Sequence, residues 1–224
     1  MMAKNQRGCT LLDVAAKGSW FDSLWHHVKK VLSPLQLAEL VMTKDELGLN
    51  LLMHAEGMVL GSVLSALMEA LCSGKIVELV MATDRRGQNL LMHATRNCTL
   101  SYTLHVLKEL VPLVQLMELA MARDESGHTI LVIATERLCF SSVLHDLKEV
   151  LSTTKLMELA MVKDRRGLNL LMHAAESTTL FALVLNATKD VLSPDQVMKL
   201  FVDKDDCGKT LLMHAAQNQV LSFG

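Results

Sequence analysis

Four histidines recur at one position of a repeating pattern, namely His54, His93, His173 and His214. Histidine is a common zinc ligand, so this column raises the hypothesis of a metal site. Neighbouring units of a helical stack lie roughly 10 Å apart, whereas a shared zinc needs each nitrogen at about 2.1 Å and further ligands. We identify no Cys, Asp or Glu that recurs with these histidines from unit to unit as a second ligand. We therefore predict no metal site, and interpret each histidine as partly buried and hydrogen-bonded to a neighbouring unit's loop.

Other chemistry finds little support in the residue types. The sequence has no G-x-S-x-G elbow, no cysteine that recurs beside a histidine, and no glycine-rich loop before a helix. The adjacent carboxylates Asp205 and Asp206 lie in a predicted turn, where Asp is explained by turn chemistry. We therefore predict that the protein is not an enzyme, with no catalytic residues, no cofactor and no metal.

Methionine is frequent, with 15 residues, and could indicate a soft-metal site or an adaptable groove. The methionines keep the phase of the repeat, however, which is what core packing produces. We interpret them as core filler in three columns: Met53, Met92, Met172 and Met213; Met42, Met81, Met121 and Met161; and Met117, Met157 and Met198.

Charge alternates between the predicted turns. The two residues between the Asp (Asn5 in the first copy) and the Gly of each turn, here called the turn tip, are basic, acidic, basic, acidic, basic and acidic in succession. They contain Arg7, Glu46, Arg85, Arg86, Glu125, Arg165, Arg166 and Asp206. One interpretation is a ladder of exposed ion pairs between units, each worth under about 1 kcal/mol. The other is a charged binding strip. We favour the ladder, and the two are compatible.

These residues are positioned by a repeat of 39–41 residues. Glycine returns at Gly8, Gly48, Gly87, Gly127, Gly167 and Gly208, with Asp three residues earlier in all copies but the first. A fixed period in this range is typical of a solenoid. We expect one array over 1–224, with units at about 5–44, 45–83, 84–123, 124–163, 164–204 and 205–224, the last one incomplete.

Each unit reads as a turn and three helices. In the unit from Asp84, the Asp and a Gly of positive φ form the turn, and Asn89 is a good N-cap. Helices are then predicted over 90–96, 100–110 and 113–122. Capping boxes with proline at the first helical position predict the start of the third helix at Ser33-Pro34 and Ser193-Pro194. Ser73 and Ser152 are the predicted caps in two other units.

The row from Asp164 to Ala175, with Gly167, Asn169 and Leu171 between them, resembles the ankyrin repeat. The resemblance covers the turn and first helix of all six units. It implies an all-α, ankyrin-like helical solenoid of about 5.5 units, with a third helix where the family has part of a β-hairpin finger. It also implies binding through the turn tips and the first-helix face. Armadillo-like three-helix repeats are the structural alternative, although their units do not begin with this turn.

Composition limits the partners. Lys and Arg total 22 against 24 Asp and Glu, so the basic excess of a nucleic-acid binder is missing. No apolar run is long enough for a membrane span. The five cysteines are scattered and odd in number, from which we expect an intracellular, cytoplasmic setting. We predict a protein–protein interaction module or scaffold with a protein partner. The incomplete last unit also raises the hypothesis of self-association. The alternative is a regulatory repeat segment of a larger protein such as a channel or effector.

Overall fold

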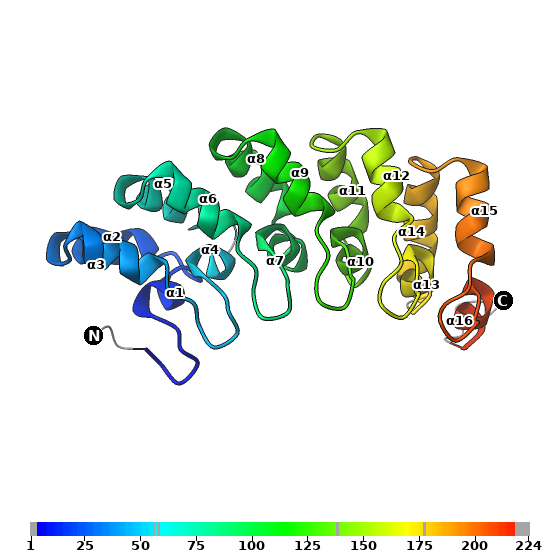
Figure 1. The fold of residues 1–224 in the computed structure, drawn as a ribbon, viewed down its shortest axis with the longest axis horizontal. Helices are drawn as coiled ribbons and strands as arrows, with labels where there is room; N and C mark the ends of the chain where they lie inside the picture. Colours follow the sequence, from blue (N-terminus) through cyan, green and yellow to red (C-terminus); the bar gives the residue numbers. More distant parts are fainter. Residues whose placement is uncertain (1–3, 56, 58, 138, 177, 218–224) are drawn as a thin grey trace. The chain divides into compact units, whose positions relative to one another are not determined.

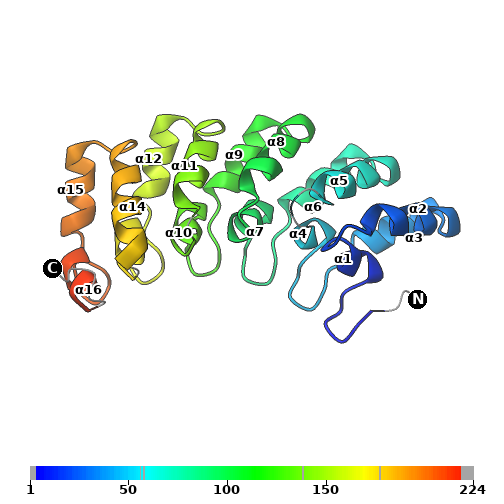
Figure 2. The same ribbon diagram turned by 180° about the vertical axis from the view of Figure 1, so that it is seen from behind.

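The computed structural model describes residues 4–55, 57, 59–137, 139–176 and 178–217. The chain forms two compact parts, Met1–Gln115 and Leu116–Gly224. Regular structure in the described residues is helical, apart from two isolated β-bridges, Thr83 with Asn89 and Lys204 with Thr210. Figures 1 and 2 show the repeating element in both parts: a loop, a short helix and two further helices.

The unit that begins at Asp84 confirms the predicted three-helix pattern. Its short helix α7 is Leu90–Arg96, its second helix α8 is Leu100–Leu110, and its third helix α9 is Leu113–Met121. The other short helices are α1 (Leu11–Ala15), α4 (Leu51–His54), α10 (Ile130–Thr135), α13 (Leu170–Ala174) and α16 (Leu211–Gln217). The other second helices are α2 (Phe21–Val31), α5 (Val59–Ala70), α11 (Phe140–Lys148) and α14 (Thr178–Lys189). The other third helices are α3 (Pro34–Val41), α6 (Ser73–Met81), α12 (Thr153–Ala160) and α15 (Pro194–Val202).

A side-chain cap starts the short helices α1, α4, α7, α10 and α13. Asn89 Oδ1 accepts the backbone N–H of Met92 at 3.0 Å, which satisfies one of the free donors of the first turn. Thr10, Asn50, Thr129 and Asn169 cap their helices in the same way. The Asp-x-x-Gly-x-Asn/Thr spacing therefore places a capped helix directly after each of these turns.

The third helices begin as predicted in most units. Ser33 and Ser193 form capping boxes with Gln36 and Gln196, and Ser152 accepts from the backbone N–H of Lys155. The prediction of Ser73 as a helix cap is wrong. It is the first residue of α6, and the cap position is Cys72, which makes no side-chain cap hydrogen bond. Ser73 falls where Pro34 stands in the first unit, one residue after the cap.

The core of each part consists of the apolar side of the short helices and the facing sides of the second and third helices. Leu52, Leu91, Leu131 and Leu171 are each 0% exposed at one position of the short helix. Second helices bury one face, as Phe140, Val143 and Leu147 show in α11. In the first part α1 contacts α4 and α4 contacts α7; in the second, α10 contacts α13 and α13 contacts α16.

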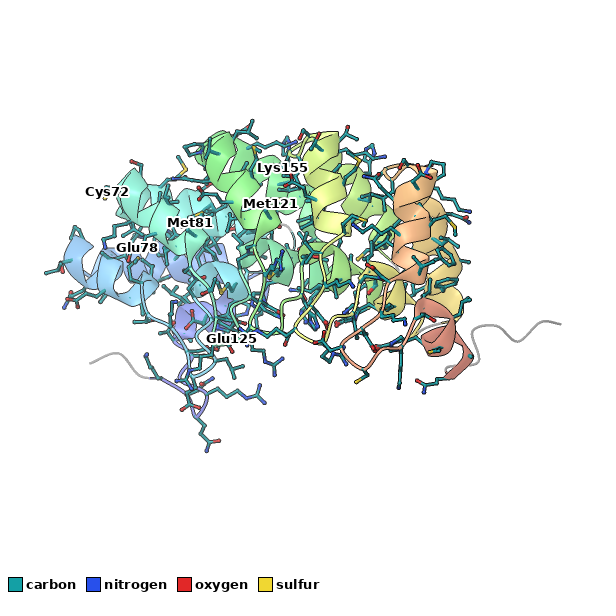
Figure 3. All side chains as sticks on the ribbon, turned by 45° about the vertical axis from the view of Figure 1, so that its right-hand side comes forward. Cys72, Glu78, Met81, Met121, Glu125 and Lys155 are labelled. Atoms are coloured by element: carbon teal, nitrogen blue, oxygen red, sulfur yellow. The ribbon has the colours of Figure 1, made fainter. Side chains whose placement is uncertain are left out.

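The methionines differ in burial, although their shared phase in the repeat predicts that all of them are core residues. Met53, Met92 and Met172 are 5%, 0% and 0% exposed and fill the core. Met198 and Met213 are 58% and 53% exposed, so the core interpretation is wrong for them. The column on the third helix that includes Met81 and Met121, both labelled in Figure 3, is half-buried. Phase with the repeat identifies a position that recurs, but burial depends on what covers that position.

Candidate functional site

Each unit presents an ordered turn whose structural bonds are made by Asp and backbone. In the turn of Asp164, Oδ1 accepts the N–H groups of Arg166 and Leu168 at 2.8 and 2.9 Å. The N–H of Gly167 donates to the Asp164 carbonyl at 3.1 Å. Asn5 makes the same pair of side-chain bonds in the first turn, to Arg7 and Cys9.

The turn glycines are required for two reasons. All six have a positive φ, from 74° to 84°, as the turn prediction expects. Within each part the backbone of the next turn also approaches closely. A Cβ on Gly127 would lie 2.9 Å from the backbone nitrogen of Arg165, and one on Gly48 would lie 2.8 Å from that of Arg85.

This approach allows successive turns to hydrogen-bond through their main chains. In the first part, Glu46 N–H donates to the Arg7 carbonyl at 3.1 Å, and Arg85 N–H donates to the Leu47 carbonyl at 2.9 Å. In the second part, Arg165 N–H donates to the Ser126 carbonyl and Asp206 N–H to the Arg166 carbonyl, both at 3.0 Å. We call these bonds the backbone ladder. It spaces the tips at a fixed interval within each part.

The structure places all eight predicted site residues on the tips, with exposed side chains: Arg7, Glu46, Arg85, Arg86, Glu125, Arg165, Arg166 and Asp206. In the second part, Figure 3 shows Glu125 at the end of its loop, on the far side of the unit from Lys155 of α12. Lys155 is paired along its own helix with Glu158 at 2.7 Å. Arg166 Nε lies 3.3 Å from Asp164 Oδ2 of its own turn.

The histidine column bonds differently from the prediction. His93 Nε2 lies 3.1 Å from Asp84 Oδ2, and His214 Nε2 lies 2.9 Å from Asp205 Oδ2. These two histidines, and His173 likewise, thus bond to the Asp of their own turn, nine residues earlier, and not to a neighbouring unit's loop. Contrary to the prediction, an Asp does recur with the histidines: it is the Asp of the turn, nine residues earlier. Each of these histidines is the fourth residue of its short helix, and the fold brings that residue against the Asp of the turn before the helix.

Burial governs the charge state of these histidines. It lowers the pKa of His54, His93 and His173, in the last case to about 4, although a carboxylate beside each ring opposes the shift. The rings are therefore neutral at pH 7, and Nε2–H of His93 and His173 donates to the Asp. Burial alone would raise the pKa of Asp164, but N–H donors from Leu168 and Arg166 lower it.

Two places add a third ligand-type side chain to an Asp–His pair. Cys9 joins Asp45 and His54, and His128 joins Asp164 and His173; the donor atoms of each group lie within 4.8 Å of one another. Both added residues directly follow a turn glycine, Gly8 or Gly127, and come from the preceding unit. Neither group is predicted from the sequence above. The signal for them is the constant spacing of nine residues between the turn Asp and the histidine.

Comparison with solved structures is informative about the fold. The ankyrin repeat domain of Bcl-3, described as a unique member of the IkappaB family, matches with a TM-score of 0.56 and 20% identity, over 97% of this chain and 100% of that one. The chain has the ankyrin-repeat fold. At a sequence identity of 20%, this match shows the fold and nothing about function.

Two other solved structures also match the chain. A chain in the complex of the predatory endopeptidase Bd0816 from Bdellovibrio bacteriovorus with immunity protein Bd3460 gives a TM-score of 0.60 at 14% identity, covering 97% of this chain and 94% of that one. An ankyrin repeat domain from Acinetobacter baumannii gives 0.47 at 19% identity, covering 93% and 91%. No protein-family model and no curated protein matches the sequence.

Proposed function

We propose that this ankyrin-repeat chain is a protein–protein interaction module without catalytic activity, acting inside the cell and binding its partner through the turn tips. The observation that carries the proposal is the separation of roles at each tip. Asp, Gly and the backbone ladder hold the turn, while the charged side chains between them stay exposed. A preformed, regularly spaced surface binds without an entropic cost of ordering loops.

The tips of the second part support a charge-selective surface. Glu125, then Arg165 and Arg166, then Asp206 follow one another along the ladder in that part. Exposed charge of alternating sign favours a partner segment of complementary pattern and disfavours a uniformly charged one. This is the reason for proposing a protein partner in preference to nucleic acid. Among the described residues, no helix is long and apolar enough to cross a bilayer.

The test is capture of partners from cell extract by the purified chain, followed by mass spectrometry. Arg165→Glu is the sharpest variant, because the ladder uses only the Arg165 backbone. We expect the captured partner to be lost while the melting temperature stays unchanged. Lys148→Glu, the same charge change at an exposed position of α11, is the matched control and should retain the partner. Equal capture by both variants contradicts the proposed tip surface.

An ion-pair ladder between the tips predicts a different outcome. If such pairs stabilise the array, Arg165→Glu lowers the melting temperature slightly, and added salt reduces the difference between variant and wild type. Capture and stability are therefore separate readouts for the two interpretations of the same residues.

The alternative function is a regulatory repeat segment of a larger protein, such as a channel or effector. An antibody raised against this chain would distinguish the two. A band of the natural protein much larger than 224 residues supports the regulatory segment. A band of the expected size supports a separate interaction module.

We also propose self-association through α15 and α16, because this face exposes large apolar side chains. Met198, Val202, Leu212 and Met213 are 58%, 64%, 56% and 53% exposed. Residues 218–224 of the sixth unit lie outside the described residues. Light scattering of the purified chain should show a concentration-dependent oligomer that Leu212→Glu disrupts. Leu113→Glu, at an equally exposed position of α9, should leave it intact. A monomer at all concentrations excludes this contact.

A further inference from the structure

The most unusual polar cluster of the first part lies beneath its first two turns. Cys9, Asp45 and His54 are 7%, 7% and 3% exposed, and their donor atoms lie within 4.8 Å of one another. Cys9 Sγ is 3.7 Å from Asp45 Oδ2, and His54 Nε2 is 3.2 Å from the same oxygen. A thiol, a carboxylate and an imidazole thus meet around one small volume away from solvent.

His54 differs from the other histidines of its column. In His93, His173 and His214 the Nε2 atom makes a hydrogen bond to the turn Asp. His54 Nε2 lies 3.2 Å from Asp45 Oδ2, but this buried atom makes no hydrogen bond to any residue that the structure describes. A buried polar nitrogen without a partner is costly, so its presence calls for an explanation.

The residue after the turn glycine explains why this unit is special. In the next pair of units Leu49 stands where Cys9 does, and it lines a cavity of about 250 Å³ together with Asp84 and His93. Beside this leucine, the hydrogen-bonding needs of Asp84 and His93 are met by their bond to each other. Only where cysteine replaces the leucine does the first part combine sulfur, oxygen and nitrogen donors with an unpartnered histidine.

We propose that Cys9, Asp45 and His54 form a zinc-binding site that joins the first repeat to the second. Zinc accepts thiolate, carboxylate and imidazole at about 2.0–2.3 Å, so neighbouring donors in a tetrahedral site lie roughly 3.3–3.8 Å apart. The contacts of Asp45 Oδ2 with the sulfur and the nitrogen, at 3.7 and 3.2 Å, are close to that range. In its Nδ1–H tautomer, His54 presents the Nε2 lone pair to the metal.

The charges around the cluster favour a cation. Asp13, itself 3% exposed, acts electrostatically on both Cys9 and His54, and Lys17 is the positive group that acts on them. Cys9 Sγ donates to Asp45 Oδ2 at 3.7 Å, so the free site holds a thiol. Metal binding replaces the S–H bond by an S–Zn bond and releases that proton to solvent. The result compensates buried negative charge and gives the His54 nitrogen a partner.

The second cluster of this type does not carry the same inference. His173 Nε2 is hydrogen-bonded to Asp164, and Arg166 Nε lies 3.3 Å from the same carboxylate oxygen. The donor atoms are already partnered and a guanidinium stands beside them, which opposes a metal cation. His128 therefore serves as a control position in the second part.

The experiment uses the reduced, chelator-treated 224-residue chain with Zn²⁺ in calorimetry and Co²⁺ in absorption spectroscopy. Two variants use residues that the chain itself carries at equivalent positions and should fold: Cys9→Leu, as at Leu49, and His54→Val, as at Val14. We expect the wild type to bind one Zn²⁺ and to show sulfur-to-cobalt charge transfer. Both variants should bind Zn²⁺ at least tenfold more weakly, and Cys9→Leu should lose the charge-transfer band.

The controls separate this site from other thiols and histidines. His128→Leu should leave the affinity, the stoichiometry and the cobalt spectrum of the wild type unchanged. Zn²⁺ should raise the melting temperature of the wild type and of His128→Leu, but not that of Cys9→Leu. The proposal is overturned if the wild type binds no Zn²⁺, or if Cys9→Leu keeps the charge-transfer band and the wild-type affinity.

Discussion

His173 donates its Nε2–H to Asp164 Oδ2 across 3.2 Å, although the two residues lie nine positions apart, one in a helix and the other in a turn. Asp164 Oδ1 meanwhile accepts two backbone N–H groups of the turn. One carboxylate thus fixes the loop with one oxygen and attaches the loop to α13 with the other. The turn and the helix that follows it are therefore joined through a single side chain.

This pair makes stability depend on pH. The pKa of His173 falls from 6.5 to about 4 on folding because burial disfavours the charged ring. The unfolded chain therefore binds the proton more readily, so stability is complete above about pH 6.5 and is lost as the pH falls toward 4. The shift corresponds to about 3 kcal/mol for this residue. Urea unfolding at several pH values should show a smaller acid loss in His173→Gln than in the wild type.

A direct titration checks the same prediction. The His173 ring signal, followed by NMR, should have its midpoint near pH 4. A midpoint near 6.5 would mean that the ring is hydrated in the folded protein, and the proposed origin of the acid sensitivity would then be wrong.

Alanine variants of two turn glycines distinguish the cost of backbone strain from the cost of crowding the next turn. Gly127→Ala introduces a Cβ with positive φ that also lies 2.9 Å from the Arg165 nitrogen. Gly208→Ala has the same φ requirement, with no atom of the described residues within 4 Å of the new Cβ. Each should lose about 1 kcal/mol or more to strain, and Gly127→Ala should lose more because the ladder must shift. Equal unfolding free energies for the two variants would contradict the contribution of the ladder.

Asn169 performs two functions that substitution can separate. Its Oδ1 caps α13 by accepting the N–H of Met172, and its Nδ2 donates to the carbonyl of Leu200 at 2.9 Å. Asn169→Thr keeps the cap, as Thr129 does, but leaves the carbonyl without its donor, for a loss of about 1–2 kcal/mol. Asn169→Ala should lose about 1 kcal/mol more. Chemical denaturation measures both, and a Thr variant as stable as wild type would exclude the bridging role.

Among the residues that the structure describes, Cys98 is the non-glycine residue with a positive φ, which is 55°. It follows α7 in the break before α8, and its side chain is exposed. Cys98→Gly should stabilise the chain by up to about 1 kcal/mol, because glycine adopts this conformation without strain. Cys98→Ala removes the sulfur but keeps the strain, so its melting temperature should match the wild type. A gain in both variants would point to the thiol and not to the backbone.

Local rules allowed much of the fold to be predicted. Asn89 and Gly87 determine a capped helix after a turn through atoms within a few residues of one another, and the structure confirms both. Ser73 shows the limit of such rules, since a shift of one residue changes a cap into a first helical position. The histidines show another, because their contact with the turn Asp depends on the angle at which the short helix crosses the loop. The meeting of Cys9 with Asp45, 36 residues apart, requires the stacking of whole units.

Because the backbone ladder connects the turns through N–H and C=O groups that every residue except proline possesses, the identity of the tip residues is decoupled from the assembly of the stack. Arg165 and Asp206 make the same main-chain bond to the preceding turn with side chains of opposite charge. The two positions between Asp and Gly are therefore free to mutate at little thermodynamic penalty. In evolution, or in a designed library, such positions allow recognition to change while the scaffold is retained.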